Sequence, residues 1–102
     1  MANLWFDVLS VNVDMGYRYF EGGPHESNCE DKSTLYKKLL KEYGRCIGKQ
    51  YIDTNGKKLA IGWIFLKRDK YSDTKETFLS ETWVTVYKSE PKREVIIHAE
   101  YA

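Results

Sequence analysis

The chain has 102 residues, a length that fits a single domain. Its 16 basic and 15 acidic residues leave a net charge of +1, which excludes both a polycation built for nucleic acid and an acidic mimic of nucleic acid. Two cysteines are too few for a disulfide framework, and no apolar stretch approaches the roughly 20 residues that span a membrane. The start of the chain lacks the pattern of a signal peptide, so we expect a cytoplasmic protein with reduced thiols and no membrane partner.

The first third of the chain predicts one strand and a loop. Leu4–Val13 carries apolar residues on both faces, which favours a strand that is covered on both sides for part of its length. After a turn at 14–16, the segment up to Phe20 either extends this strand or begins a surface excursion. Residues 21–32 contain Gly-Gly-Pro, which is typical of a loop.

Ser33–Tyr43 predicts a helix. Ser33 suits the N-cap, and Gly44 suits the position after the last turn because glycine enters the left-handed conformation without strain. One stripe of the helix is apolar and the opposite stripe is lysine-rich. The apolar stripe consists of Leu35, Leu39, Leu40 and Tyr43. A helix of this length is marginal alone, so we expect the apolar stripe to pack on a sheet.

The rest of the chain predicts four strands. Arg45–Asp53 and Leu59–Lys67 flank Asn55-Gly56, a dipeptide typical of a two-residue hairpin turn. Apolar residues on both faces of the second strand indicate a central position, and Gly62 within it suggests a bulge or a close approach by another element. Phe78–Lys88 and Arg93–Tyr101 complete the set, the last with the alternation of an edge strand. The order β-α-β-β-β-β predicts an α+β fold, with one mostly antiparallel sheet of four to five strands and one helix on a face.

Catalytic and metal-binding patterns are weak in this sequence. The soft metal ligands are His25, Cys29, Cys46 and His98, and only the first two have a spacing compatible with one coordination shell. Acidic neighbours around Cys29 and a helix C-terminus before Cys46 both disfavour a reactive thiolate. The carboxylates of the polar turn lack an apolar pocket that would shift their pKa values. We therefore expect no catalytic, cofactor or metal site and a protein that is not an enzyme.

Charge is distributed unevenly along the chain. Residues 14–31 hold five acids and one base, whereas residues 32–58 hold eight bases and two acids. This contrast is typical either of separate solvated surfaces or of a dipolar surface that orients a partner.

The polar turn between the two longest strands is the predicted contact region. Residues 69–77 form a long connection for a hairpin, and such loops are often functional. The predicted partner-binding residues are Lys67, Arg68, Lys70, Tyr71 and Asp73, which combine types enriched in protein interfaces. The mixture of basic and aromatic residues also keeps single-stranded nucleic acid as an alternative partner.

A resemblance supports this interpretation. Three stretches are similar to a segment found in small uncharacterised bacteriophage proteins: Gly62–Arg68 (GWIFLKR), the pattern Y-x-D-T-x-E-T over residues 71–77, and Glu81–Val86 (ETWVTV). The resemblance implies a phage-encoded protein of the host cytoplasm and brings no residue roles. We expect a non-enzymatic protein that binds and modulates a host protein or complex. The alternatives are a single-stranded nucleic-acid binder and a homo-oligomer with a ligand or enzyme site at the subunit boundary.

Overall fold

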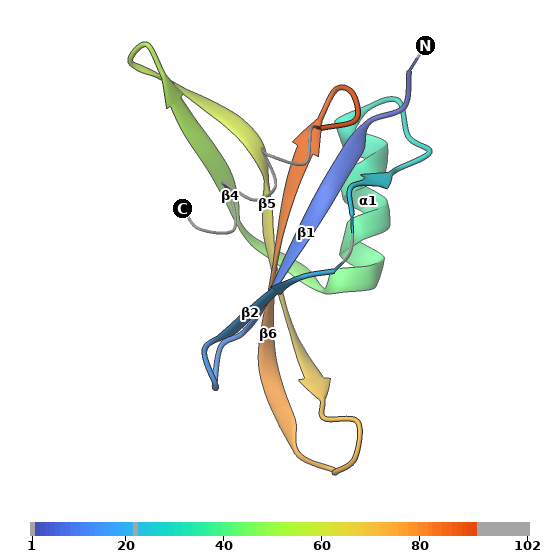
Figure 1. The fold of residues 1–102 in the computed structure, drawn as a ribbon, viewed down its shortest axis with the longest axis vertical. Helices are drawn as coiled ribbons and strands as arrows, with labels where there is room; N and C mark the ends of the chain where they lie inside the picture. The colour runs from blue at the N-terminus through green and yellow to red at the C-terminus, as the bar shows by residue number, and fades with distance from the viewer. Residues whose placement is uncertain (1, 22, 92–102) are drawn as a thin grey trace.

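The computed structural model describes residues 2–21 and 23–91, with Thr54 described by its backbone alone. Within these ranges the chain forms six strands and one helix, shown in Figure 1. The strands are β1 (Trp5–Asn12), β2 (Tyr17–Phe20), β3 (His25–Glu26), β4 (Arg45–Thr54), β5 (Lys57–Lys70) and β6 (Thr77–Tyr87). The helix α1 spans Lys32–Tyr43.

All strand pairs of the sheet are antiparallel, in the order β2-β1-β6-β5-β4, and β3 pairs separately with the start of β1. The predicted α+β class, with one helix and an antiparallel sheet, is confirmed. The strands β2 and β3 lie in two segments with other predictions: a strand extension or surface excursion for the first, and a loop for the second. β2 folds back on β1 as a hairpin, and the segment 21–32 includes the short strand β3. The predicted strand Arg93–Tyr101 lies outside the described residues.

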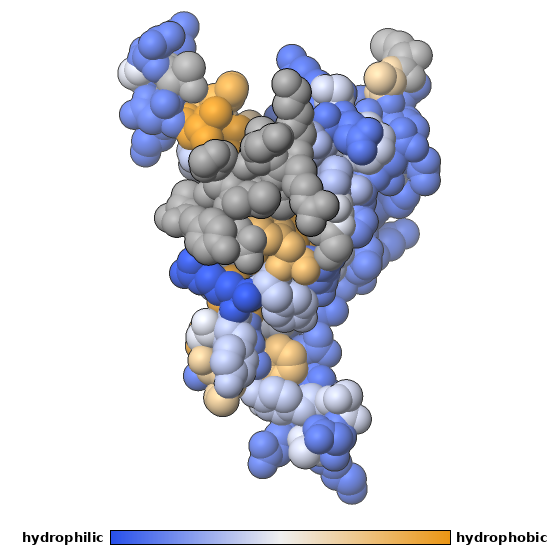
Figure 2. Space-filling model, viewed as in Figure 1, coloured by the Kyte–Doolittle hydropathy of each residue, from blue (hydrophilic) through white to orange (hydrophobic). Residues whose placement is uncertain are grey.

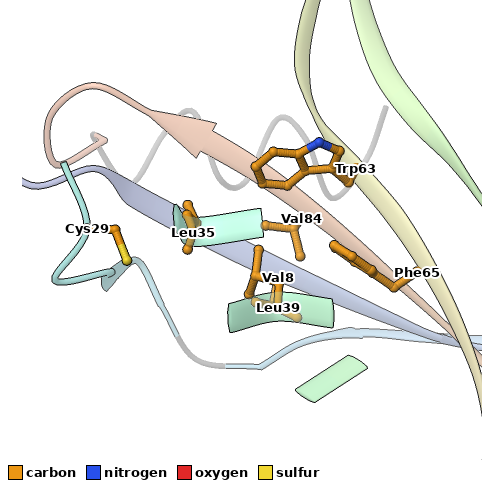
Figure 3. Close-up of a cluster of buried hydrophobic side chains, with 7 residues drawn as sticks. All are labelled: Val8, Cys29, Leu35, Leu39, Trp63, Phe65 and Val84. Atoms are coloured by element: carbon orange, nitrogen blue, oxygen red, sulfur yellow. The ribbon is translucent and has the colours of Figure 1, made fainter. Parts of the chain in front are cut away.

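The core lies between α1 and one face of the sheet, and Figure 3 shows its side chains. Strand register places Val8 opposite Val84, and Val84 opposite Trp63, so their side chains project on the same face. Phe65 completes this layer, and it is fully buried like Val8 and Val84. Leu35 and Leu39 of α1 cover the layer, as the apolar stripe predicts.

The residues at both ends of α1 suit the hydrogen bonding and backbone geometry of a helix terminus. The N-cap is Asp31, whose carboxylate accepts a hydrogen bond of 2.7 Å from the Thr34 N–H, so the prediction of Ser33 was wrong. Ser33 lies within the first turn instead. This bond lowers the pKa of the Asp31 carboxyl. Gly44 follows the last turn with φ +95°, as predicted, and a Cβ there would lie 2.5 Å from the Leu66 carbonyl oxygen.

Two β-bulges shape β4 and β5. Ile47 and Ile61 each lack a directly paired partner in the β4–β5 register. Because of the bulge, Ile61 lines a pocket on the face of the sheet opposite α1. Simple alternation along the strand would place its side chain on the same face as Trp63. Gly62 lies against β6 so closely that a Cβ would be 1.8 Å from the Val84 carbonyl oxygen. Both a bulge and a close approach are therefore present at the predicted site.

The face of the sheet opposite α1 is partly apolar and contains a buried carboxylate. Trp83 is half-buried there, and its indole N–H donates to Glu81 at 2.6 Å, whereas Trp63 belongs to the core. The Tyr87 hydroxyl donates to Asp7 at 2.9 Å. Burial raises the pKa of the Asp7 carboxyl, although the hydrogen bond from Tyr87 acts in the opposite direction.

Candidate protein-binding surface

The β5–β6 hairpin projects beyond the helix-covered core, as Figure 1 shows, and carries the five predicted contact residues. The structure does not bring them together on one face. Lys67 lies on the helix side of the sheet, where its ammonium group donates to the Glu42 carbonyl at the end of α1 (3.1 Å). Arg68 lies on the other side and donates to Thr77 at 3.3 Å. Lys70 is exposed near the end of β5, and Asp73 is exposed in the turn.

Tyr71 attaches this hairpin to the β1–β2 hairpin. Its hydroxyl accepts a hydrogen bond of 3.2 Å from the Asn12 side-chain amide, and its ring lies 4.7 Å, centroid to centroid, from the ring of Phe78. The Val13 N–H donates to the Leu79 carbonyl at 2.9 Å, and the Leu79 N–H donates to the Asp14 carboxylate at 3.3 Å. The turn of the β1–β2 hairpin therefore lies along the β5–β6 hairpin, and the two hairpins together form one end of the molecule.

A row of aromatic side chains lies on the helix side of this end. Tyr17 is paired with Asn12 in the β1–β2 register, so it projects on the same side as the amide that binds Tyr71. Tyr19 projects on that side two residues later. Tyr17 is 62% exposed and Tyr19 is 55% exposed, whereas Tyr71 and Phe78 are half-buried. We call these four residues the tyrosine face.

Sequence reasoning missed Tyr17 and Tyr19, although a signal for them was present. The segment 17–20 alternates as Tyr-Arg-Tyr-Phe, so both tyrosines share one face of any strand formed there. The alternation does not reveal that α1 ends before it covers these two tyrosines. The exposure follows from the tertiary position of the helix, which covers the other end of the sheet (Figure 1).

The charge at this end of the molecule is nearly balanced. Residues 13–20 and 67–76 together hold five bases and four acids. The bases are Arg18, Lys67, Arg68, Lys70 and Lys75, and the acids are Asp14, Asp69, Asp73 and Glu76. A surface with exposed aromatic rings and little net charge is suited to protein contact, where tyrosine is enriched and a strong field is not needed.

Two of the residues considered as metal ligands, His25 and Cys29, have structural partners, and His98 lies outside the described residues. His25 shares a hydrogen bond of 2.8 Å with the Glu21 carbonyl, and its ring packs on Phe6. Cys29 is buried and donates to the Ser27 carbonyl at 3.4 Å. Within residues 2–21 and 23–91, no three His, Cys, Asp or Glu side chains are grouped so that they could hold a metal ion.

The described part of the chain contains no helix with the length and hydropathy needed to cross a bilayer. Comparison with known proteins adds no assignment, because no protein-family model, curated protein or solved structure matches the chain. The function of this protein is therefore inferred from its own residues.

Proposed function

We propose that this chain is a small non-enzymatic protein that binds and modulates a partner protein through the tyrosine face. The observation that carries the proposal is the pair of exposed rings, Tyr17 and Tyr19, beside the anchored Tyr71. Tyrosine offers a large amphipathic contact area and has few rotatable bonds, so ordering it on binding costs little conformational entropy.

The hydrogen bonds between the two hairpins that carry these rings favour tight binding. The β1–β2 hairpin is held against the β5–β6 hairpin by hydrogen bonds from the Asn12 amide to the Tyr71 hydroxyl and from the Leu79 N–H to the Asp14 carboxylate. A surface that is already ordered in the free protein avoids part of the entropy loss of association. We expect the interface to be centred on the exposed tyrosines, with Lys67 on the same side of the sheet, whereas Arg68 and Lys70 lie on the other side of the β5–β6 hairpin.

The proposed partner is a protein of a bacterial host. The similarity of residues 62–86 to small bacteriophage proteins supports this choice, because accessory proteins of that size commonly act by binding host components. The proposed location is accordingly the host cytoplasm.

Single-stranded nucleic acid is the second candidate partner, because exposed tyrosines can also stack on bases. The near balance of five bases and four acids at this end is unfavourable for it, since phosphate binding requires a strong positive field. Nucleic-acid binding would weaken steeply as salt rises, whereas a protein contact centred on tyrosine rings would change little.

The test is affinity purification from host lysate with three matched baits: the wild-type chain, a Tyr17→Ser and Tyr19→Ser double variant, and a Tyr51→Ser variant. Tyr51 is 54% exposed on β4, far from the tyrosine face in the sheet order, so it controls for the loss of an exposed ring. Each sample is divided in two, one half is treated with nuclease, and both halves are analysed by mass spectrometry and native mass.

We expect a stoichiometric host protein with the wild-type and Tyr51→Ser baits and its loss with the double variant. Retention of the partner by the double variant would contradict the placement of the site. A partner that disappears on nuclease treatment would favour nucleic acid, and a homodimer without any partner would favour the ligand-binding oligomer.

A further inference from the structure

At the other end of the sheet, the start of β5 pairs with only one strand among the described residues. β5 spans Lys57–Lys70, but it pairs with β6 only from Gly62 onward. Its first residues, 57–60, pair with β4 on one side and with no described strand on the other, and Ile61 is the bulge residue between them and Gly62. Val86 and Tyr87 of β6 likewise pair with β1 alone. β4 and the start of β5 thus form an arm that diverges from β6 (Figure 1).

Two pockets flank this divergence, one on each face of the sheet. The helix-side pocket has a volume of about 390 Å³ and includes Tyr36 and Trp63, and the pocket on the opposite face has a volume of about 730 Å³ and includes Leu9 and Trp83. Val86 lines both pockets. Figure 2 shows hydrophobic atoms at the base of the arm, in keeping with this lining.

Neighbouring residues of the arm line opposite pockets. Lys49 lines the helix-side pocket and Gln50 the opposite pocket, and Ala60 and Ile61 divide in the same way. An extended segment lying between β5 and β6 would therefore direct alternate side chains into the two pockets. The volumes are large enough for several apolar side chains on each face.

Side chains from elsewhere occupy the backbone acceptors at this opening. The Lys32 ammonium donates to the Ala60 carbonyl at 3.4 Å, and the Gln50 amide donates to the Val84 carbonyl at 2.8 Å. Ala60 would face Tyr87 if the β5–β6 register continued by two more residues. The Ala60 carbonyl thus has a side-chain partner at a position where β5 is not paired with β6, whereas Val84 pairs with Trp63 and its carbonyl, which lies against Gly62, accepts from the Gln50 amide as well.

The charges around the opening are mostly positive. Lys32 and Lys49 line the helix-side pocket, and Lys57 and Lys58 begin β5. The opposite pocket adds Arg18 at its lining. Asp53 is an acidic exception on the arm. Asp7, in the opposite pocket, is buried and accepts a hydrogen bond from the Tyr87 hydroxyl, so it is a second acidic exception. A segment with acidic side chains between apolar ones is the best match to this arrangement.

We propose that the opening between the β4–β5 arm and β6, the arm cleft, binds an extended acidic segment of a partner protein as an added β-strand. Backbone hydrogen bonds to β5 and to the end of β6 supply affinity. In a segment that alternates acidic and apolar residues, the acidic side chains face Lys32 and Lys49 on the helix side, and the apolar side chains enter the opposite pocket beside Ile61 and Trp83. This site lies apart from the tyrosine face and stands independently of it.

The test uses the full chain and a fluorescein-labelled, end-blocked peptide, EVEVEIEVE, in fluorescence anisotropy. We expect saturable binding, and hydrogen exchange should show new protection at residues 57–61 and 86–87. A peptide with proline in place of the valine at its fourth position and the isoleucine at its sixth keeps all of its glutamates but cannot form the strand ladder, so its affinity should fall by about tenfold or more. Equal binding of the two peptides would overturn the added strand.

Charge variants test the choice of ligand. Lys32→Glu combined with Lys49→Glu should lower the peptide affinity by about tenfold, whereas Lys75→Glu in the turn of the distant hairpin should leave it unchanged. Protection confined to other residues would overturn the site. So would binding that appears only in a chain ending at Pro91, because residues 92–102 would then be the natural occupant.

Discussion

The helix-covered end of the sheet and the hairpin end show two ways of stabilising the same β5–β6 ribbon. At the covered end, Phe65 and Val84 are fully buried under α1. At the hairpin end, polar contacts through Asn12 and Tyr71 hold the strands together while Tyr17 and Tyr19 stay exposed. Stability therefore depends mainly on the first region, and the second can present residues to a partner at little cost to the fold.

The largest expected contrast comes from two phenylalanines. Phe65→Ala removes a fully buried ring and should cost about 3–5 kcal/mol in the free energy of unfolding. Phe78→Ala removes a half-buried ring at the hairpin end, so its cost should be clearly smaller. Urea denaturation measures both, and equal losses would contradict the division into two regions.

Two glycines with positive φ sharpen the same contrast. Gly44 (φ +95°) faces the Leu66 carbonyl, whereas Gly16 (φ +78°) has no neighbouring atom within 4 Å of the position that a Cβ would occupy. Gly44→Ala should cost near the upper end of about 1–3 kcal/mol, because backbone strain and a close contact add. Gly16→Ala should cost about 1 kcal/mol from backbone conformation alone. Thermal unfolding of the two variants gives the comparison.

Tyr71→Phe tests the connection between the hairpins. It keeps the ring on Phe78 but removes the acceptor of the Asn12 amide, so we expect a loss of about 0.5–1.5 kcal/mol. Hydrogen exchange should show faster opening at residues 12–17 than in the wild type. An unchanged exchange pattern would show that the backbone bond between Val13 and Leu79 suffices.

Asp7 should make the free energy of unfolding depend on pH. Burial raises its pKa above the usual value of 3.8, so the folded chain holds this proton more tightly than the unfolded chain. Stability should therefore fall as pH rises from about 4 through the raised pKa and then level off. Tyr87 and His25 oppose the shift. Asp7→Asn should remove this fall. Denaturation of both proteins at several pH values between 4 and 8 measures it, and a fall that persists in the variant would contradict its assignment to Asp7.

Much of the fold follows from local signals in the sequence. The alternation in β1 and β6, the apolar stripe of α1 and the Asn55-Gly56 turn all predict their elements, and both turn residues have the positive φ that the turn requires. The N-cap was misplaced because Asp31 and Ser33 are both good capping residues, and only the geometry of the chain entering the helix selects between them.

The candidate site was only partly predictable, for a physical reason. Sequence identifies Tyr71 as part of a polar turn, but its position depends on Asn12, 59 residues away. Likewise, the exposure of Tyr19 depends on where α1 stops covering the sheet. Long-range packing decides both, and periodicity within one strand carries no information about it.

The strand order has a consequence for how the chain is made. β6 lies in the middle of the sheet, between β1 and β5, although it is the last described strand in the sequence. β1 therefore leaves the ribosome long before the neighbour against which Val8 and Phe6 pack has been synthesised. Because pairings this distant in sequence close slowly, β1 and its apolar side chains must wait unpaired on that edge during translation. This interval is when the nascent chain is most open to capture by a chaperone or by a second copy of itself.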